Sequence, residues 1–448
     1  HVVFGVNGDA YDTSNGVATG IVISNGELIT SSSASLGFGI LADGTIKYGS
    51  AALRMVATLA DGTKINLTHV NKERKQNTTG VYLLTDKFND VTASTEAGVE
   101  VIFDVIDEHK DQGLRIGKTY SGTVKEVVLV QSNPNKNQTK IGKNQFVLAT
   151  HQNSPYYQTL KNLKVGTKVD INVDDVSDDR IDWSEVVVGM GIFHLLMENG
   201  EPTSTAINDP AVHPRTSMGI KADGTIVLMQ NDGRQYGWAN GLTFMEMVEY
   251  MKSLGVVTLF NFDGGGSSTI QATLPGNDRA QILNKPSDGN ERANTNALLF
   301  IAKEEKVEDN PVEKLHIYPK INGNFATKAL ILENSIMQFE VKATDRYYYK
   351  VPLDTSKVTY SIENEAGSNI GTITQDGTFK ATSGTGKGRI VASYGDLKAY
   401  FDIEVVNKLT LIETDLTILS IAPGKQIKLN LRSYYENVPV VMSNESLT

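Results

Sequence analysis

Cysteine is absent from the 448-residue chain. Its absence excludes disulfide bonds, thiolate metal sites and a cysteine nucleophile. Extracytoplasmic bacterial proteins commonly lack cysteine, although many cytosolic proteins lack it too. The chain also begins at His1 rather than at methionine, with a strand-like apolar run. We therefore expect that a signal peptide was removed before this point and that the protein is extracellular or on the cell surface.

Positive charge is scarce, and long hydrophobic runs are missing. Lysine and arginine together number 42 against 52 aspartates and glutamates, so the formal net charge is −10. This balance argues against a nucleic acid or an anionic membrane as a partner, because both require concentrated Lys and Arg. No apolar stretch reaches the length of a transmembrane helix. An anionic substrate must therefore be held by a few local donors.

Short apolar runs separated by Gly, Asn and Asp dominate the first half of the chain, and such runs are typical of β-strands. Hairpin turns are predicted at three Asp-Gly pairs: Asp43-Gly44, Asp61-Gly62 and Asp223-Gly224. The clearest helix is predicted over residues 242–254, where Thr243 and Glu246 form a capping box and Gly255 ends the pattern. We therefore expect residues 1–305 to form an α+β domain rich in antiparallel sheet.

The composition changes near residue 303, where a charged segment leads into a proline. Residues 306–312 are predicted to be a linker. Residues 313–406 show short strands and polar turns with no helical period, which predicts an all-β sandwich. Its stretch 376–381 resembles the bacterial Ig-like repeats of surface proteins. Residues 407–448 look like a partial second β module, either truncated or an added sheet, because they are too few to close a sandwich.

The most informative chemical feature is Asp263 with the glycines that follow it. A buried apolar strand is predicted over residues 256–262, and Asp263-Gly264-Gly265-Gly266-Ser267-Ser268 comes directly after it. Glycine adopts backbone torsions closed to other residues and lets a ligand approach the peptide N–H groups, so this loop could hold phosphate oxygens beside a carboxylate. It is not a Walker A loop, because the Gly-Lys-Ser/Thr ending and the following helix are missing. A tight structural turn is the alternative interpretation.

Four other segments carry groups that could reach such a site. They contain Asn7 and Asp9, Arg215 and Thr216, Asp232 and Arg234, and Glu291 and Arg292. An arginine offers a planar fork of donors to a phosphate. Each segment alone is equally compatible with an ordinary surface loop or turn. The acidic run at residues 174–182 lacks the glycine and terminal glutamate of a calcium loop, so we expect no metal ion and no cofactor.

In their order along the chain, these motifs resemble the phosphodiester glycosidase family, whose animal member removes N-acetylglucosamine from phosphodiester-masked mannose. The resemblance covers about residues 1–303 and is carried by six motifs: Val6-Asn-Gly-Asp-Ala-Tyr11, Arg215-Thr-Ser-Met-Gly-Ile220, Asn231-Asp-Gly-Arg234, Gly241-Leu-Thr-Phe-Met-Glu246, Asn261-Phe-Asp-Gly-Gly-Gly-Ser-Ser268 and Ser287-Asp-Gly-Asn-Glu-Arg292. Two departures affect the sugar pocket. Ala10-Tyr11 stands where the family commonly has two aromatic residues, and residues 189–194 stand where relatives often carry a more glycine-rich turn.

The resemblance implies hydrolysis of an α-linked sugar 1-phosphodiester to a free sugar and a phosphomonoester. Asp263 and Glu291 are hypothesised to be the essential carboxylates. The expected substrate- and phosphate-binding residues are Asn7, Asp9, Arg215, Thr216, Asp232, Arg234, Gly264, Gly265, Gly266, Ser267, Ser268 and Arg292. We expect N-acetylglucosamine or a related sugar on a cell-envelope phosphoglycan, with the C-terminal β modules attaching the enzyme to the wall or spacing it from the surface.

Two other functions stay open at this point. A metal-dependent phosphodiesterase would need a cluster of His and Asp residues, and the chain has seven histidines, none in a paired ligand spacing. A non-catalytic cell-surface glycan-binding protein is favoured by the Ig-like tail. Insensitivity to chelators would count against the first function, and ligand retention without turnover would favour the second.

Overall fold

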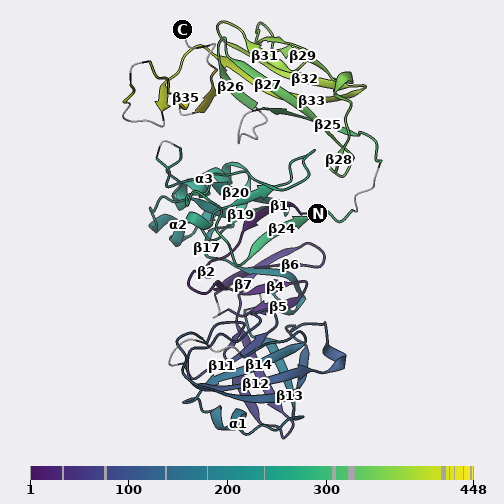
Figure 1. Ribbon diagram of the computed structural model, residues 1–448, viewed down its shortest axis with the longest axis vertical. Helices are drawn as coiled ribbons and strands as arrows, with labels where there is room; N and C mark the ends of the chain where they lie inside the picture. Colours follow the sequence, from purple (N-terminus) through teal and green to yellow (C-terminus); the bar gives the residue numbers. More distant parts are fainter. Residues whose placement is uncertain are drawn as a thin grey trace. The chain divides into compact units, whose positions relative to one another are not determined.

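The computed structural model shows a protein made mostly of β-strands (Figure 1). Contacts divide the chain into two compact units. The large unit consists of Val6–Thr269 and Asn284–Leu298, and the terminal unit consists of His1–Gly5, Ile270–Leu283 and Leu299–Thr448. The structure describes residues 2–32, 35–74, 78–136, 139–178, 180–236, 238–304, 309–320, 328–414, 420–422, 424–427, 429–436, 438–443 and 446.

The prediction divides the chain at one point, residue 305. The compact units are each made of several segments instead, because residues 270–283 group with the terminal unit. The boundary stays a prediction. Of the predicted linker, residues 306–308 lie outside the described residues.

The largest sheet of the large unit has eight strands. Their order is β10 (His69–Val70), β11 (Val81–Thr85), β14 (Gln145–His151), β12 (Gly98–Val105), β13 (Thr119–Val130), β15 (Lys168–Asp175), β8 (Leu53–Leu59) and β9 (Lys64–Leu67). All neighbours are antiparallel except β10 and β11. The hairpin between β8 and β9 turns at Asp61-Gly62, as predicted, with φ of +87° at the glycine. The expectation of a domain rich in antiparallel sheet is therefore confirmed.

A second sheet shares the core of the first. Its order is β5 (Glu27–Thr30), β4 (Val22–Ser24), β16 (Val186–Gly191), β6 (Leu36–Leu41) and β7 (Ile46–Ser50). Ile23, Leu28 and Val186 from this sheet belong to the same buried cluster as the inner residues of the eight-stranded sheet. The cluster also contains Trp183, which is 1% exposed and donates its indole N–H to the carbonyl of Ser50 at 2.8 Å. A hairpin of β2 (Tyr11–Asp12) and β3 (Val17–Ala18) precedes this sheet.

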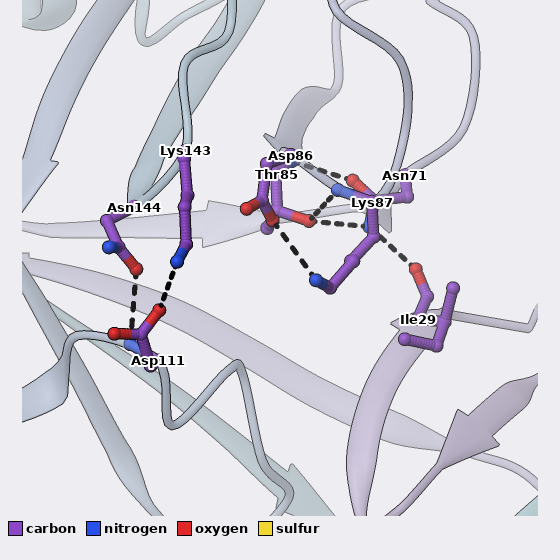
Figure 2. Close-up of polar contacts among 8 residues, drawn as sticks. All are labelled: Ile29, Asn71, Thr85, Asp86, Lys87, Asp111, Lys143 and Asn144. Atoms are coloured by element: carbon purple, nitrogen blue, oxygen red, sulfur yellow. Dashed lines mark hydrogen bonds and ion pairs between the residues drawn. The ribbon is translucent and has the colours of Figure 1, made fainter.

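Asn71 ties these two sheets together (Figure 2). Its side-chain Nδ2 donates to the carbonyl of Ile29 at 2.6 Å and to Oγ1 of Thr85 at 2.9 Å, and its Oδ1 accepts from the Thr85 amide at 2.7 Å. The next residue, Lys72, donates its ammonium to the carbonyl oxygens of residues 18–20. These bonds fix a cation at the end of β3 and the segment that links it to β4.

A third sheet of the large unit is covered by the helices. Its order is β18 (Glu201–Pro202), β17 (His194–Glu198), β21 (Val256–Asn261), β19 (Arg215–Lys221) and β20 (Ile226–Asn231). Helices α2 (Ser204–Asn208) and α3 (Phe244–Ser253) share a buried apolar cluster with β17 and β21. The other described α-helix of the unit, α1 (Tyr157–Lys161), packs at the eight-stranded sheet.

The predicted capping box of α3 is confirmed. Oγ1 of Thr243 accepts from the Glu246 amide at 3.2 Å, and Oε2 of Glu246 accepts from the Thr243 amide at 2.8 Å. Four apolar residues of α3 are buried against the sheet, which anchors the helix. After Gly255, whose φ is +87°, the chain enters β21. Because β21 lies between β17 and β19, it is the most enclosed strand of this sheet and a rigid base for the segment that follows it.

The terminal unit contains a four-stranded sheet and two larger sheets. The four strands are, in order, β23 (Gln281–Ile282), β22 (Ile270–Ala272), β1 (Val2–Asn7) and β24 (Ala297–Ile301). The last residues of β1 and the first of β24 belong to the large unit, so both strands lead from one unit into the other.

The two larger sheets pack on one buried core. One has the order β25 (Lys314–Pro319), β27 (Ile336–Thr344), β31 (Thr378–Ala381) and β30 (Gly371–Ile373), with β28 (Lys350–Val351) beside β27. The other has the order β29 (Thr359–Asn364), β32 (Gly386–Tyr394), β33 (Leu397–Val406), β26 (Lys328–Leu332), β36 (Val438–Val441), β35 (Leu431–Tyr435) and β34 (Leu411–Thr414). The described strands after residue 407 therefore extend this sheet, with β36 parallel to β26. A relation to Ig-like repeats and a separate second module stay predictions.

No described helix has the length and hydropathy needed to cross a bilayer.

Candidate active site

Antiparallel pairing brings the predicted site segments to one edge of the α3-covered sheet. Ser217 of β19 lies opposite Asn261, the last residue of β21. Arg215, the first residue of β19, lies opposite Asn231, the last residue of β20. Residues 263–268, which we call the glycine loop, and the loop after β20 therefore leave the sheet at the same edge.

Asn7, at the end of β1, joins the first strand to the glycine loop. Its Nδ2 donates to the carbonyl of Asp263 at 2.9 Å, and its Oδ1 accepts from Thr216 Oγ1 at 2.6 Å and from the Thr269 amide at 3.0 Å. Asn7 and Thr216 are buried, so breaking their hydrogen bonds would leave buried polar atoms without partners and would cost free energy. Both were expected to bind substrate, and that role stays a prediction. In the structure their polar atoms bond to each other and to residues 263 and 269, which holds the glycine loop in place.

The amides of the glycine loop are largely used within the protein. The amides of Gly265, Ser267 and Ser268 donate to the carbonyl oxygens of Pro214, Gly264 and Gly265, at 3.0, 3.2 and 3.2 Å respectively. Residues 265–267 accordingly form a short 3-10 turn. Three of these amides already have acceptors within the protein, and the binding of a phosphate by the loop stays a prediction.

The glycines instead make room for charged side chains. A Cβ atom on Gly265 would lie 2.7 Å from Nη1 of Arg234. A Cβ atom on Gly266 would lie 2.2 Å from Nη2 of Arg292 and 2.2 Å from Oδ2 of Asp288. A side chain at either position would displace these groups, so the glycines are what allows two guanidinium groups to lie against the loop. Two arginines are therefore gathered at the glycine loop.

Arg292 is held on the loop by Asp288, a residue that was not predicted as part of the site. Oδ2 of Asp288 accepts from Nε and Nη2 of Arg292 at 3.0 and 2.6 Å, and Nη1 of Arg292 donates to Ser267 Oγ at 3.4 Å. The hydrogen bond to Asp288 is the main cause that raises the pKa of Arg292, and the charge of Asp263 adds to it. Glu291, predicted as the second essential carboxylate, is exposed, and Asp288 is the acid that reaches the loop. The four-residue spacing of Asp288 and Arg292 was the available signal.

Arg234 is presented to the loop by a strained backbone and a histidine. Its φ is +58°, a conformation that non-glycine residues rarely adopt. Its Nε and Nη2 lie 3.3 and 3.1 Å from Nδ1 of His213. Burial and the charges of Arg234 and Arg215 lower the pKa of His213, so the ring is neutral at pH 7 and accepts from the guanidinium. His213 thus orients Arg234.

Arg215 is buried at the start of β19, with 6% of its surface exposed. Its guanidinium carbon lies 3.9 Å from the centre of the Phe244 ring, and its Nη2 donates to the carbonyl of Ala211 at 2.8 Å. Its Nε is buried and has no partner among the described residues. Burial lowers the pKa of the half-buried His194, and the charge of Arg215 lowers it further. Arg215 therefore contributes a buried positive charge. Because its guanidinium group is stacked on the Phe244 ring, few of its donors are free to bind a phosphate directly.

Asp9 is the buried carboxylate of the site, with 6% of its surface exposed. Its Oδ2 lies directly over the backbone of Gly20 and Gly191, where a Cβ atom would come within 2.3 and 2.0 Å of it. Burial is the main cause that raises the pKa of Asp9 to about 6, and the charge of Asp263 raises it further, whereas Lys72 opposes the rise. Asp9 and Asp263 are therefore two electrostatically coupled carboxylates in different environments.

Asp232 was expected to bind substrate or phosphate, and that role stays a prediction. Its carboxylate accepts from Nε1 of Trp238 at 2.7 Å, from the Lys285 amide at 3.1 Å to each oxygen, and from Nδ2 of Asn284 at 3.3 Å. A carboxylate with these donors, next to a phosphate, would add repulsion rather than affinity. Asp232 instead anchors the segment that leads to the Asp288 loop. No sequence signal distinguished this role from a turn.

Several buried polar atoms at the site have no hydrogen-bond partner in the part of the chain that the structure describes. They include Oγ of Ser268, Oγ1 of Thr269 and both amide atoms of Asn296. Oδ1 of Asn296 lies beside Gly8, where a Cβ atom would be 1.9 Å from it. Buried polar groups are rarely left unpaired, so these atoms are unusual among the described residues. Within the described ranges, no three His, Asp or Glu side chains gather as potential metal ligands.

A family model matches the part of the chain that carries most of this arrangement. Residues 124–301 match the model of the phosphodiester glycosidases, so this part of the chain is similar to that family. The matched residues include the glycine loop, Arg215, Arg234 and Arg292, whereas Asn7 and Asp9 precede the match.

Other known proteins resemble parts of the chain. SPbeta prophage-derived uncharacterized protein YomE of Bacillus subtilis (strain 168) is 40% identical over 81 residues, which are 18% of this chain and 12% of that protein. A putative exported protein from Burkholderia pseudomallei K96243 has a TM-score of 0.51 at 17% identity, covering 66% of this chain and 65% of that one. The zebrafish N-acetylglucosamine-1-phosphodiester alpha-N-acetylglucosaminidase catalytic domain, auto-inhibited by its pro-peptide, has a TM-score of 0.20 at 15% identity, covering 64% and 81%. The chain thus spans about an eighth of the curated relative, and the Burkholderia likeness concerns the fold alone.

Proposed function

We propose that the glycosidase hydrolyses an α-linked sugar, N-acetylglucosamine or a related one, from a sugar 1-phosphodiester on a cell-envelope glycan. The observation that supports this proposal is the pairing of two coupled carboxylates, Asp9 and Asp263, with two arginines packed on the glycine loop. The match to phosphodiester glycosidases supports the class of bond. The sugar and the envelope location follow from the resemblance and from the expected extracellular site.

The charges fit the cleavage of a glycosidic bond to phosphate. The C1–O bond breaks with its electrons moving to the phosphate, and the sugar passes through an oxocarbenium-like transition state that carboxylates stabilise. Arg234 and Arg292 would neutralise the departing phosphate, which is already a good leaving group. In this proposal Asp263 stabilises the cationic sugar, and Asp9 takes the proton of the attacking water.

Asp9 replaces Glu291 in the proposed carboxylate pair. A base is most useful when its pKa lies close to the working pH, and burial places the pKa of Asp9 at about 6. Glu291 is exposed, whereas Asp9 is buried. The rate should therefore rise with pH through about 6, as Asp9 loses its proton.

The test is release of sugar from the methyl phosphodiester of α-N-acetylglucosamine 1-phosphate in ¹⁸O-labelled water. We expect free N-acetylglucosamine with the label at C1, because a glycosidase breaks the C1–O bond. Label in the phosphate would instead show a phosphodiesterase and overturn the proposal, as would no release from a panel of α-linked sugars.

Three variants separate the carboxylate assignments. Asp263→Asn and Asp9→Asn should each lower the rate by about 10²- to 10⁴-fold, the usual contribution of a positioned acid or base. Glu291→Gln should stay close to the wild type. A large loss in Glu291→Gln together with an active Asp9→Asn would restore the pair expected from sequence.

A further inference from the structure

Lys72, a half-buried lysine between β10 and β11, is bonded to the backbone of a short segment near the site. Its ammonium donates to the carbonyl oxygens of Ala18, Thr19 and Gly20, the last two at 3.1 and 3.5 Å. A lysine ammonium has three N–H donors, so one side chain can hold all three oxygens. Lys72 therefore fixes the backbone that runs from the end of β3 towards β4.

The residues on either side of Lys72 determine where its ammonium lies. Asn71 has a φ of +52°, a left-handed conformation that asparagine adopts more readily than most residues. The side chain of Asn71 bonds to both β5 and β11, which anchors the turn (Figure 2). Glu73 pairs with Lys136 at 2.7 Å, so another lysine neutralises this neighbouring carboxylate. The turn thus directs a positive charge out of the eight-stranded sheet.

The same backbone segment also contacts Asp9. The amide of Gly20 hydrogen-bonds to the Asp9 carboxylate, and a Cβ atom on Gly20 would lie 2.3 Å from Oδ2 of Asp9. This amide belongs to the peptide group between Thr19 and Gly20, whose oxygen accepts from Lys72. In a trans peptide the C=O and the N–H point in opposite directions. One peptide group therefore lies between the ammonium of Lys72 and the carboxylate of Asp9.

Two further hydrogen bonds restrain this peptide group. Oγ1 of Thr30 donates to the carbonyl of Gly20 at 2.9 Å. The amide of Thr19 donates to the carbonyl of Ala10, the residue after Asp9, at 3.0 Å. The peptide group is therefore held on both sides, and its N–H stays directed at the carboxylate.

The charges around Asp9 act in opposite directions. Burial is the main cause that raises the pKa of Asp9 to about 6, and the charge of Asp263 raises it further. The charge of Lys72 and the amides of Ala10 and Gly20 lower it. The strands next to Asp9, β1 and β16, contain no charged residue. An ammonium bonded to a peptide oxygen also polarises that peptide and strengthens its N–H as a donor.

We propose that Lys72 is a positioning residue of the active site, which acts through the Thr19–Gly20 peptide to hold Asp9 in place and in its ionised form. This inference rests on the proposed function, in which Asp9 takes the proton of the attacking water. None of the site residues expected from sequence lies in the eight-stranded sheet. Through Lys72 this sheet supplies a charge to the reaction.

The pH dependence of sugar release separates this role from a purely structural one. Lys72→Gln keeps an N–H donor for the carbonyl oxygens but loses the charge. With the methyl phosphodiester of α-N-acetylglucosamine 1-phosphate, the midpoint on the acid side should move up from about 6 by about one pH unit. The rate should then fall about tenfold at pH 5 and stay nearly the same at pH 8.5. An equal loss at both pH values, or an unchanged midpoint, would overturn the inference.

Two other variants control for the loss of a positive charge. Lys72→Arg keeps the charge and the donors, so it should retain the midpoint of the wild type. Lys87→Met removes a charge from the same sheet, directly after β11, where Lys87 lies 3.8 Å from Asp86. Its midpoint should not move. A shift in Lys87→Met as large as that in Lys72→Gln would show an effect of net charge alone and overturn the inference.

Urea unfolding measures the same link without turnover. Asp9→Asn should shift the urea midpoint upwards more at pH 7.5 than at pH 4, because only the ionised carboxylate is disfavoured by burial. This difference should be larger when Asp9→Asn is made in Lys72→Gln or in Lys72→Met, where Asp9 ionises without the ammonium. An equal difference with and without Lys72 would overturn the inference. If the wild type releases no sugar, the proposed function fails, and this measurement still supports or overturns the link between Lys72 and Asp9.

Discussion

Replacing Asp9 by asparagine should make the fold more stable at neutral pH while it removes activity. Burial raises the pKa of this carboxyl from its ordinary value of 3.8 to about 6. The ionised form is therefore disfavoured in the folded protein relative to the unfolded chain. Asparagine has nearly the same shape and carries no charge, so the variant escapes this cost.

The size of the effect follows from the two pKa values. The difference between about 6 and 3.8 corresponds to about 3 kcal/mol of stability lost at pH 7 through the ionisation of Asp9. Asparagine accepts backbone hydrogen bonds with only one oxygen, which costs about 1 kcal/mol. We therefore expect Asp9→Asn to gain about 2 kcal/mol at pH 7. Below 3.8 the carboxyl is protonated in both states, so the gain disappears there. It grows as the pH rises from 3.8 to about 6, and above 6 it stays constant.

Urea unfolding at pH 7.5 and pH 4 measures this dependence. The fluorescence of Trp183 reports on the core of the large unit, provided that both proteins carry Trp238→Phe so that one tryptophan remains. A single local probe also avoids treating the two units as one transition. A variant that is less stable at pH 7.5, or equally stabilised at both pH values, would refute the burial argument for Asp9.

Three further changes test the geometry around the glycine loop. Gly266→Ala places a Cβ atom 2.2 Å from the Arg292 guanidinium, so the rate of sugar release should fall by about 100-fold. The free energy of unfolding should stay the same. Full activity of this variant would contradict the close packing. Thr216→Val removes the hydroxyl donor to Oδ1 of Asn7 and leaves only a backbone donor to that oxygen. The free energy of unfolding in urea should fall by about 1–3 kcal/mol. An unchanged urea midpoint would show that the bond between Thr216 and Asn7 is unimportant. Arg215→Lys keeps the charge but loses the planar stack on an aromatic ring, so thermal unfolding should show a loss of about 1 kcal/mol, and an equally stable variant would show that charge alone matters.

Local patterns were predictable, and distant pairings were not. The capping box of Thr243 and Glu246 depends on residues three positions apart, and the structure confirms it. The choice between Asp9 and Glu291 as partner of Asp263 depends on the distance in space between the ends of strands β1 and β21. The spacing of residues along the sequence does not give this distance. The family resemblance supplied the segments of the site, but not which acid in each segment is buried.

The glycines show a second limit of the sequence. Their presence in the loop correctly indicated a close approach to the backbone. The approaching groups, however, are the guanidinium groups of Arg234 and Arg292, which belong to the protein itself. Composition cannot distinguish a space for a ligand from a space for a side chain, because both require the same missing Cβ atom.

The bonds of Asn7 have a consequence for the order of events during protein synthesis. Asn7 emerges from the ribosome early, yet its partners Thr216, Asp263 and Thr269 follow 209, 256 and 262 residues later. At 5–20 residues per second, the first strand waits roughly 13 to 52 s before the last of these partners exists. The eight-stranded sheet ends at residue 175 and has all its strands well before that time. A nascent chain released before the glycine loop is made would thus contain every strand of the eight-stranded sheet and lack Asp263, so the proposed activity requires translation through this loop.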